Sequence, residues 1–298
     1  MLSTLAAALL AWSNAADPAS IGLASAATPA ALIQTCGGKF AWEDPAPPIH
    51  IYGNVYYVGS CGISSLLLVS PAGHILIDGG TEKNAASVAS NIERLGYRLH
   101  DIKYILNSHE HYDHTGGLKE LQRLTGARVI ALAISKPMLE AGHSFREDPQ
   151  LELLKAFPAI HVDRAIKDGG TVRLGKLKLT AHSTPAHSPG STSWTWMSCE
   201  QAKCVRIAYA DSVTIPVDKD YRLADHPEHV AQFRQAMKTI AALPCDVLVT
   251  PHPDISNLFN RLAGEAPLID TSACAAYGAR GIRNLEAEIQ KEQAAPTN

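Results

Sequence analysis

Short apolar runs alternate along the chain with longer segments whose apolar residues recur every three or four positions. The runs predict buried strands, and the longer segments predict amphipathic helices. We expect strands at Ile51–Val58, Ser65–Val69, His74–Ile77, Ile102–Leu106, Val129–Ala133 and Val247–Thr250, and hairpins at Val172–Thr180 and Ser193–Tyr209. We expect helices at Thr81–Leu95, Leu118–Leu124, from Val230 to Ile240, and at Ser272–Gln290.

Strands occur in both halves of the chain, and helices follow them in each half. This order predicts an α+β protein in which helices cover the faces of sheets. No low-complexity linker interrupts the chain between Ile49 and Glu292, so residues 27–298 are expected to form a single domain. Loops beyond the strand ends are where we expect the chemistry.

Composition narrows the class of protein. Of the 298 residues, 46% are hydrophobic and 18% are charged, which is typical of a globular chain rather than a disordered one. The 26 basic and 29 acidic side chains leave a formal charge of −3, so we expect neither a nucleic acid nor a membrane surface as a partner. No apolar run reaches the roughly 20 residues that a membrane-spanning helix needs.

The first residues resemble a secretory leader. Leu2 to Trp12 is a short apolar run, and small residues after it offer cleavage sites at positions 13–15 and 24–26. We therefore expect residues 1–26 to be a signal peptide, and the mature protein to be periplasmic or secreted. No Lys or Arg precedes the run, so an Ala-rich tail of a cytosolic protein is the alternative.

The cysteines fit an oxidising compartment, because there are six of them and no repeated C-x-x-C spacing. Cys199 and Cys204 flank the turn of a predicted hairpin, which would hold their sulfur atoms close enough to join. Order along the chain suggests Cys36 with Cys61 and Cys245 with Cys274 for the others. Reduced, buried cysteines are the alternative reading.

Histidines cluster where the predicted strand at Ile102–Leu106 ends. His109 and His111 are two residues apart, so in extended or turn backbone their imidazoles point the same way and can reach one ion. Asp113 and His114 lie farther along the turn and can face a second ion. A solvated loop is the usual explanation for one histidine, but three imidazoles and a carboxylate within six residues indicate a metal site.

Two later histidines supply ligands that this cluster lacks. His187 lies in the turn-rich stretch 183–190, and His252 follows the predicted strand at Val247–Thr250. Each is weak evidence alone, because a histidine beside proline in a turn is common. Together they complete three histidines for one ion, and two histidines with a carboxylate for another.

In this order, H-x-H-x-D-H, then T-P-x-H, then a late histidine, the chain resembles the metallo-β-lactamase superfamily. The finer pattern resembles subclass B3, because His114 follows the aspartate and Ser212 occupies the slot where other subclasses place a zinc-binding cysteine. The similarity runs from about Ile51 to the end and includes Tyr52-Gly53-Asn54, Cys61-Gly62-Ile63-Ser64, Ile77-Asp78-Gly79, Ser193-Trp194-Thr195-Trp196, Tyr209-Ala210-Asp211-Ser212 and Thr250-Pro251-His252.

The resemblance implies a four-layer αβ/βα sandwich that holds two zinc ions at one edge. It assigns His109, His111 and His187 to the first zinc, and Asp113, His114 and His252 to the second. It further implies that Asp78 fixes a ligand imidazole or the loop behind it, and that Ser212 and Thr214 contact the carboxylate of a substrate. Ala186 stands where the family has glycine, but the ligand itself is retained.

The activity that this resemblance implies is hydrolysis of the β-lactam amide of penicillins, cephalosporins and carbapenems. We expect a monomer; the alternative is a higher assembly in which the N-terminal segment reaches a neighbouring subunit. Two zinc ions lower the pKa of a shared water toward neutrality, so no serine or cysteine nucleophile is needed, and Asp113 would orient that water. Glu110 is interpreted as pointing outward, and His226 and His229 as lying on a solvated or capping face.

Superfamily members of the glyoxalase II and lactonase types have a similar first motif. Many of them bridge the metals with an aspartate in the slot near Asp211, and the sequence does not decide whether Asp211 or Ser212 faces the metals. A secreted zinc-binding protein without activity is a further alternative, although all six ligands are present.

Overall fold

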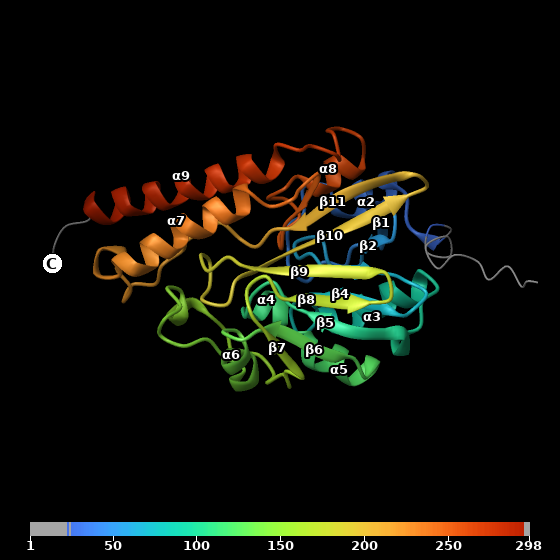
Figure 1. Ribbon diagram of the computed structural model, residues 1–298, viewed down its shortest axis with the longest axis horizontal. Coiled ribbons are helices and arrows are strands. Elements are labelled where there is room, and N and C mark those ends of the chain that lie inside the picture. Colours follow the sequence, from blue (N-terminus) through green and yellow to red (C-terminus); the bar gives the residue numbers. More distant parts are fainter. Residues whose placement is uncertain (1–22, 24, 295–298) are drawn as a thin grey trace, which may run out of the picture.

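The computed structural model describes residue 23 and residues 25–294 (Figure 1). The predicted leader, residues 1–26, therefore lies almost entirely outside the described part of the chain. Among the described residues, no helix has the length and apolar character needed to cross a membrane.

The strands form two sheets. The first has the order β1-β2-β3-β4-β5-β6-β7, with β1 to β4 antiparallel and β4 to β7 parallel. Its strands are β1 (Ile49–Tyr52), β2 (Val55–Tyr57), β3 (Leu66–Leu68), β4 (His74–Ile77), β5 (Ile102–Leu106), β6 (Arg128–Leu132) and β7 (Arg164–Ile166). The second has the order β12-β11-β10-β9-β8 and only its β11–β12 pair is parallel. Its strands are β8 (Thr171–Leu174), β9 (Leu177–Ser183), β10 (Thr192–Glu200), β11 (Lys203–Tyr209) and β12 (Val247–Val249).

Helices lie on the outer faces of the sheets. In Figure 1, α7 and α9 run together along one side of the strands, and α3 and α5 lie on the opposite side. The α-helices are α2 (Pro29–Cys36), α3 (Asn84–Arg94), α4 (Tyr112–Thr115), α5 (Leu118–Thr125), α6 (Lys136–Ala141), α7 (Pro227–Ala241), α8 (Leu258–Leu262) and α9 (Ala273–Ala294). Single 3₁₀ turns occur at η1 (Leu99–Asp101), η2 (Leu151–Leu153) and η3 (Leu223–Asp225).

Three apolar cores separate these layers. The central core lies between the sheets and includes Leu66 and Leu68 of β3 and Trp194 of β10. Leu67, which points to the other face of β3, belongs instead to a core that β3 shares with α3 and α5. A third core packs the second sheet against α7 and α9, and Phe233 is fully buried in it. The result is the predicted four-layer sandwich.

Most predicted elements are present, with boundaries that differ by at most four residues. The predicted strand Ile51–Val58 is wrong, because the chain turns at Gly53, where φ is +56°, and forms the β1–β2 hairpin. A side chain at Gly53 would also approach the Cys199 carbonyl oxygen to 2.6 Å. Helices α2, α4, α6 and α8 and strand β7 are short, and their sequences carry too few periods to be recognised.

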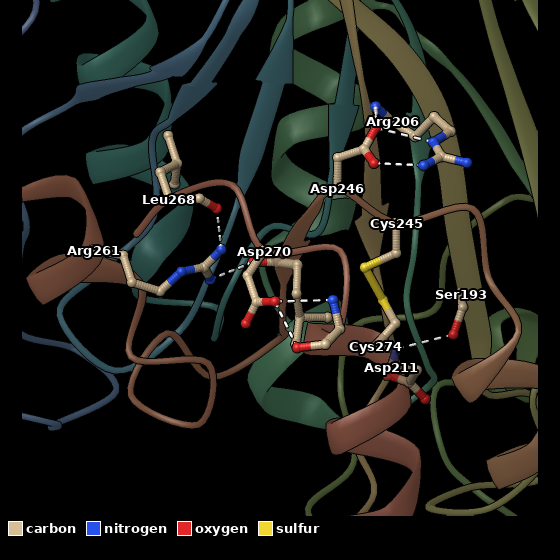
Figure 2. The surroundings of a disulfide bond; sticks show 11 residues. Ser193, Arg206, Asp211, Cys245, Asp246, Arg261, Leu268, Asp270 and Cys274 are labelled. Atoms are coloured by element: carbon tan, nitrogen blue, oxygen red, sulfur yellow. Dashed lines mark hydrogen bonds and ion pairs between the residues drawn. A yellow bond between two sulfur atoms is a disulfide. The ribbon is translucent and has the colours of Figure 1, made fainter. Parts of the chain in front are cut away.

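The six cysteines form three disulfides, in the pairs that order along the chain suggested: Cys36–Cys61, Cys199–Cys204 and Cys245–Cys274. Figure 2 shows the last of these, which ties the approach to β12 to the first turn of α9. Next to it, Asp246 forms two hydrogen bonds with the Arg206 guanidinium on β11. The Cys36–Cys61 bond joins α2 to the segment between β2 and β3.

Candidate metal centre

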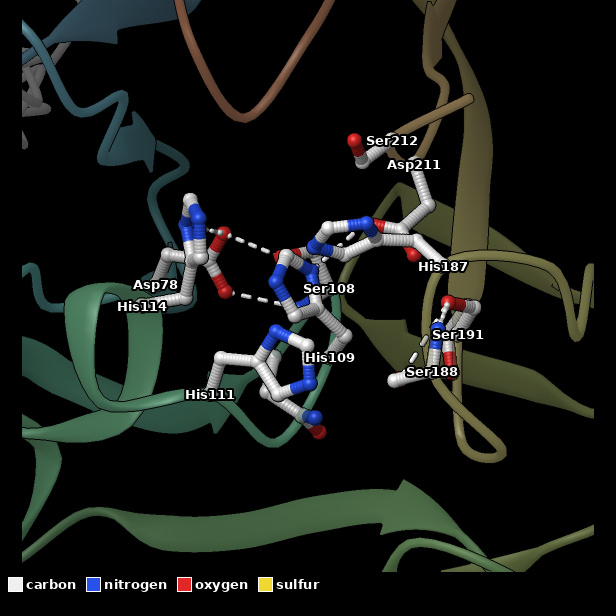
Figure 3. Close-up of polar contacts among 12 residues, drawn as sticks. Asp78, Ser108, His109, His111, His114, His187, Ser188, Ser191, Asp211 and Ser212 are labelled. Carbon is white, nitrogen blue, oxygen red and sulfur yellow. Dashed lines mark hydrogen bonds and ion pairs between the residues drawn. The ribbon is translucent and has the colours of Figure 1, made fainter. Parts of the chain in front are cut away.

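Strands of both sheets end at the same edge and bring the predicted ligands together. The H-x-H-x-D-H motif follows β5, His187 follows β9, and His252 follows β12. Trp194 of β10 donates a hydrogen bond from its indole nitrogen to the Asn107 carbonyl at 2.9 Å, so the second sheet holds the start of the motif directly. Figure 3 shows imidazoles from the two sheets turned toward one another.

The first ligand set consists of His109, His111 and His187. Their ring centroids lie 4.7 to 4.9 Å apart, and one nitrogen of each ring lies within 4.8 Å of the others. The other ring nitrogen of each imidazole, on the side away from the ligand set, forms a hydrogen bond with a neighbouring residue. The Nδ1–H of His109 donates to Asp211 Oδ1 at 2.8 Å. The Nδ1–H of His187 donates to Thr214, whose Oγ1 lies 3.0 Å and whose carbonyl oxygen lies 3.2 Å from Nδ1.

The second ligand set consists of Asp113, His114 and His252. The Nε2 atom of His114 lies 3.1 Å from Asp113 Oδ2, and that of His252 lies 3.4 Å from the same oxygen. The Nδ1–H of His252 donates to the Gly62 carbonyl at 3.0 Å. His109 also comes within 4.8 Å of Asp113 and His114, so the two sets adjoin.

The donor atoms fit a metal ion. The Nε2 atom of His109 is buried and has no hydrogen-bond partner among the described residues, although an unpaired buried donor or acceptor costs free energy. Imidazole nitrogens and carboxylate oxygens are the ligands that zinc takes in catalytic sites. The arrangement is therefore that of a metal centre, with one ring nitrogen oriented from outside and the other directed inward.

Burial and mutual contact shift the pKa values of these groups in opposite directions. Burial and the neighbouring imidazoles hold the pKa of His109 well below its usual value. Burial also opposes the charged form of His114, but contacts with Asp113 and Asp78 outweigh it and raise the pKa of His114 to about 10. Burial would raise the pKa of Asp113, but the imidazoles around it lower that pKa strongly.

Asp78 supports the motif from the end of β4. Its carboxylate accepts hydrogen bonds from the Ser108 backbone N–H and side-chain O–H, both at 2.7 Å, and from the Tyr209 hydroxyl at 2.6 Å. It also lies 3.6 Å from Nδ1 of His114. Asp78 has a left-handed φ of +61°, a conformation that aspartate tolerates better than most residues.

Glu110 does not point outward, and the interpretation of it as solvent-facing is wrong. The 188–191 turn packs against its side chain. Glu110 is fully buried, and its Oε1 accepts the Gly190 N–H at 2.8 Å. Burial raises the pKa of Glu110 to about 7. The residue thus joins the first motif to the turn that carries His187.

Gly116 and Gly117 are needed for close packing. Both have right-handed helical backbone angles. A Cβ atom at Gly116 would lie 2.5 Å from the Tyr112 carbonyl oxygen and 2.7 Å from the Glu82 nitrogen, and one at Gly117 would collide with the Gly79 carbonyl. The motif therefore packs directly on the backbone that follows β4.

Asp211 contacts a ring of the first ligand set, and Ser212 does not. Asp211 is fully buried behind His109, and its backbone N–H donates to Ser193 Oγ at 3.0 Å. The Ser212 hydroxyl lies 3.0 Å from that of Thr214, which in turn binds His187. Asp211 thus holds His109 by its outward-facing nitrogen.

Three further residues border the centre without a sequence signal that could have revealed them. Asp148 and Gln150, between α6 and η2, contact His111 and His187. Trp42, in the segment after α2, is 47% exposed, and its ring centroid lies 6.1 Å from that of His252. None follows a predicted strand or belongs to a motif, and only the folded chain brings them close.

His226 stands at the N-cap position of α7, as the capping alternative expects, but neither His226 nor His229 is fully solvated. They are half-buried rather than solvated: His226 stacks on Tyr221 with centroids 4.1 Å apart, and His229 lies 3.2 Å from the Ala186 carbonyl. Both line a cavity of about 680 Å³ between α6 and α7, beside the turn that carries His187.

Comparison with known proteins places this architecture in a family. Residues 58–200 match the family model of the metallo-beta-lactamase superfamily. The metallo-β-lactamase MIM-1 from Novosphingobium pentaromativorans is 49% identical, with a TM-score of 0.87 over 89% of this chain and 99% of that one. MEM-A1, a subclass B3 metallo-β-lactamase from a soil metagenome library, is 41% identical, with a TM-score of 0.82 over 85% and 99%. The chain belongs to the subclass B3 metallo-β-lactamases.

Members of this family are hydrolases, and the chain is accordingly an enzyme. More distant curated relatives include the hydroxyacylglutathione hydrolase of Rhodospirillum rubrum, which is 30% identical over 120 residues. That match covers 40% of this chain and only 38% of the hydroxyacylglutathione hydrolase. This chain therefore matches less than half of the length of that hydrolase.

Proposed function

We propose that the chain hydrolyses the amide bond of β-lactam antibiotics, namely penicillins, cephalosporins and carbapenems, and so confers resistance to them. We further propose that it uses two zinc ions. His109, His111 and His187 would hold the first ion, and Asp113, His114 and His252 the second. The observation that carries this proposal is the convergence of five imidazoles and Asp113 in two adjoining ligand sets, with the Nε2 atom of His109 buried and without a hydrogen-bond partner among the described residues.

Bound zinc would polarise the lactam carbonyl and bring the pKa of a water molecule toward neutrality. The chain's own contribution is orientation. Asp113 turns Oδ2 toward His114 and His252, which leaves Oδ1 to accept a hydrogen bond from the attacking water. The carboxylates of Asp211 and Asp148 fix the tautomers of His109 and His111, so that the same ring nitrogen faces inward in every turnover.

We place the substrate carboxylate at Ser212 and Thr214. The two hydroxyls lie 3.0 Å apart, next to His187. Because Thr214 Oγ1 accepts the His187 N–H, its own proton is free to be donated to Ser212 or to an anion. Two such donors beside a metal centre fit the single carboxylate that penicillins and cephalosporins carry.

The test is hydrolysis of a chromogenic cephalosporin, a penicillin and a carbapenem by the purified chain, with zinc and after removal of metal by a chelator. We expect turnover that chelation abolishes and added zinc restores. Zinc-loaded protein that leaves all three compounds intact would refute the proposal.

Thioester hydrolysis of the glyoxalase II type is the second candidate, supported by the hydroxyacylglutathione hydrolases among the relatives. The position of Asp211 argues against it, because this carboxylate binds the outer nitrogen of His109 instead of lying between the two ligand sets. A glutathione thioester offered to the same zinc-loaded protein distinguishes the two candidates.

We also propose that the chain acts as a monomer in the periplasm or outside the cell, after removal of residues 1–26. Three disulfides support an oxidising compartment. Sequencing the N-terminus of the protein recovered from the periplasm would locate the cleavage site, and light scattering would give the mass in solution.

A further inference from the structure

The segment between α6 and η2 packs one residue against the first ligand set. Asp148 is fully buried, and its Oδ2 accepts the Nε2–H of His111 at 2.8 Å. A carboxylate can only accept this hydrogen bond, so the ring proton must lie on Nε2. That tautomer leaves Nδ1 of His111 as the nitrogen with a lone pair, on the side of His109 and His187.

Gln150 extends the contact to a second ring of this set. Its side-chain amide donates to the His187 carbonyl at 2.9 Å and lies 3.4 Å from Nδ1 of the same residue. Its backbone N–H donates to Asp148 Oδ1 at 2.9 Å, so both oxygens of that carboxylate are engaged. Two residues on one short segment thereby contact two of the three imidazoles.

The same segment is anchored on its far side. Arg146 donates to the Asp148 carbonyl at 3.0 Å and to Asp218 Oδ2 at 2.8 Å. Asp218 also accepts the Glu152 N–H at 3.0 Å, and its own N–H donates to the Pro149 carbonyl at 2.7 Å. Asp218 is almost completely buried, so the segment is held in place on both of its sides.

The second ligand set has no equivalent contact with this segment. Among the described residues, no hydrogen bond or ion pair joins residues 142–153 to Asp113, His114 or His252. The groups behind those rings are Asp78 and the Gly62 carbonyl, which come from the first half of the chain. A substitution in residues 142–153 should therefore affect metal binding by the first ligand set more than metal binding by the second.

We infer that Asp148 is a positioning residue that sets the affinity of the first metal ion and leaves that of the second unchanged. This inference rests on the two-ion site proposed above. Asp148 acts through His111, by fixing the tautomer and the direction of its ring, and Gln150 adds a weaker restraint through His187. Loss of an outer partner of a ligand imidazole costs about 10-fold to 100-fold in metal affinity.

The experiment measures zinc dissociation constants for both sites by competition with a chromophoric chelator, on the full chain without substrate. For Asp148→Ala we expect the first constant to rise about 10-fold to 100-fold, and the second to change by less than about 3-fold. For Asp148→Asn, the dissociation constant of the first site should lie between those of the wild type and Asp148→Ala. The Asn amide oxygen still accepts the His111 N–H but carries no charge. The absorption spectrum of the cobalt-substituted protein should change only in the bands of the first site.

A matched control is Asp163→Ala, which removes a carboxylate that accepts the Val129 N–H at 2.8 Å, with no contact to either ligand set among the described residues. It should leave both constants unchanged. If Asp148→Ala does not fold, Asp148→Asn decides the matter, with an expected rise of at least about 3-fold in the first constant. Equal weakening of both sites, or no change in either variant, would overturn the inference.

This result is independent of the antibiotic. A wild-type chain that binds two ions and leaves β-lactams intact would refute the proposed function, and the Asp148 variants would still test the inference. A wild-type chain with fewer than two zinc sites would overturn the inference by itself.

Discussion

The two ligand sets are held in place by different kinds of groups. Side chains stand behind the rings of the first set, for example Asp211 behind His109 and Asp148 behind His111. In the second set, His252 binds a backbone carbonyl, and His114 lies 3.6 Å from a carboxylate whose shorter contacts go elsewhere. A point substitution can therefore release a ring of the first set, whereas the second depends on the path of the backbone.

Removal of a second-set ligand should have the largest effect. In His114→Ala the second zinc loses an imidazole, so we expect its affinity to fall more than about 100-fold, beyond the usual cost of losing an outer partner. The first zinc should keep its affinity within a few-fold. Zinc titration against a chelator measures both constants, and equal loss from the two sites would mean that the ligand partition is wrong.

Removal of Asp78 should lower the free energy of unfolding of the metal-free protein. Asp78→Ala leaves the Ser108 N–H without its buried acceptor and the Tyr209 hydroxyl with only the Ser64 carbonyl at 3.4 Å, which we expect to cost about 3 kcal/mol in the free energy of unfolding. Urea unfolding of metal-free protein gives this value. Asp78→Asn, which keeps an acceptor oxygen and tolerates the left-handed backbone, should lose less, and an equal loss in both variants would contradict this account.

Opening the Cys36–Cys61 disulfide tests whether backbone path governs the second set. Cys61 precedes Gly62, whose carbonyl binds His252. The double variant Cys36→Ser with Cys61→Ser should lose about 2 to 3 kcal/mol of stability and should also weaken the second zinc.

The matched control is Cys245→Ser with Cys274→Ser, because its sequence separation of 29 residues is close to the 25 of the first pair. We expect a similar loss of stability, with the ratio of the two zinc constants unchanged. A shift of that ratio in the control, or no shift in the Cys36/Cys61 variant, would contradict the claim that the second ligand set depends on the path of the backbone.

The smallest effect should come from Asp246, which touches neither set. The Arg206 guanidinium lowers the pKa of Asp246 to about 2, below its value in the unfolded chain. Its stabilisation is therefore present above about pH 4 and is lost as the pH falls toward 2. Asp246→Asn should cost about 0.5 kcal/mol at pH 7 in low salt, and less near pH 2. Urea unfolding at both pH values provides the comparison.

The sequence predicted the site correctly where the ligand motif lies next to a segment with a clear secondary-structure pattern. The strand β5 and the ligands His109 to His114 are adjacent in the chain, so one local pattern revealed both. Asp148 escaped notice because its role depends on a contact across 37 positions that no local pattern encodes. Glu110 was misplaced for a related reason: the local pattern does not show that the 188–191 turn packs against its side chain. Packing between distant segments decides such cases.

The intrinsic fluorescence of Trp42 can report metal binding by the second ligand set. It is half exposed beside His252, whereas Trp194 and Trp196 are buried in the protein interior. Emission from an indole in contact with water and an imidazole responds to the charge and proton state of its neighbour. Stepwise addition of zinc should therefore alter the fluorescence of Trp42 when His252 becomes a ligand, and Trp42→Phe should abolish that change, so the filling order of the two sites can be followed without a label.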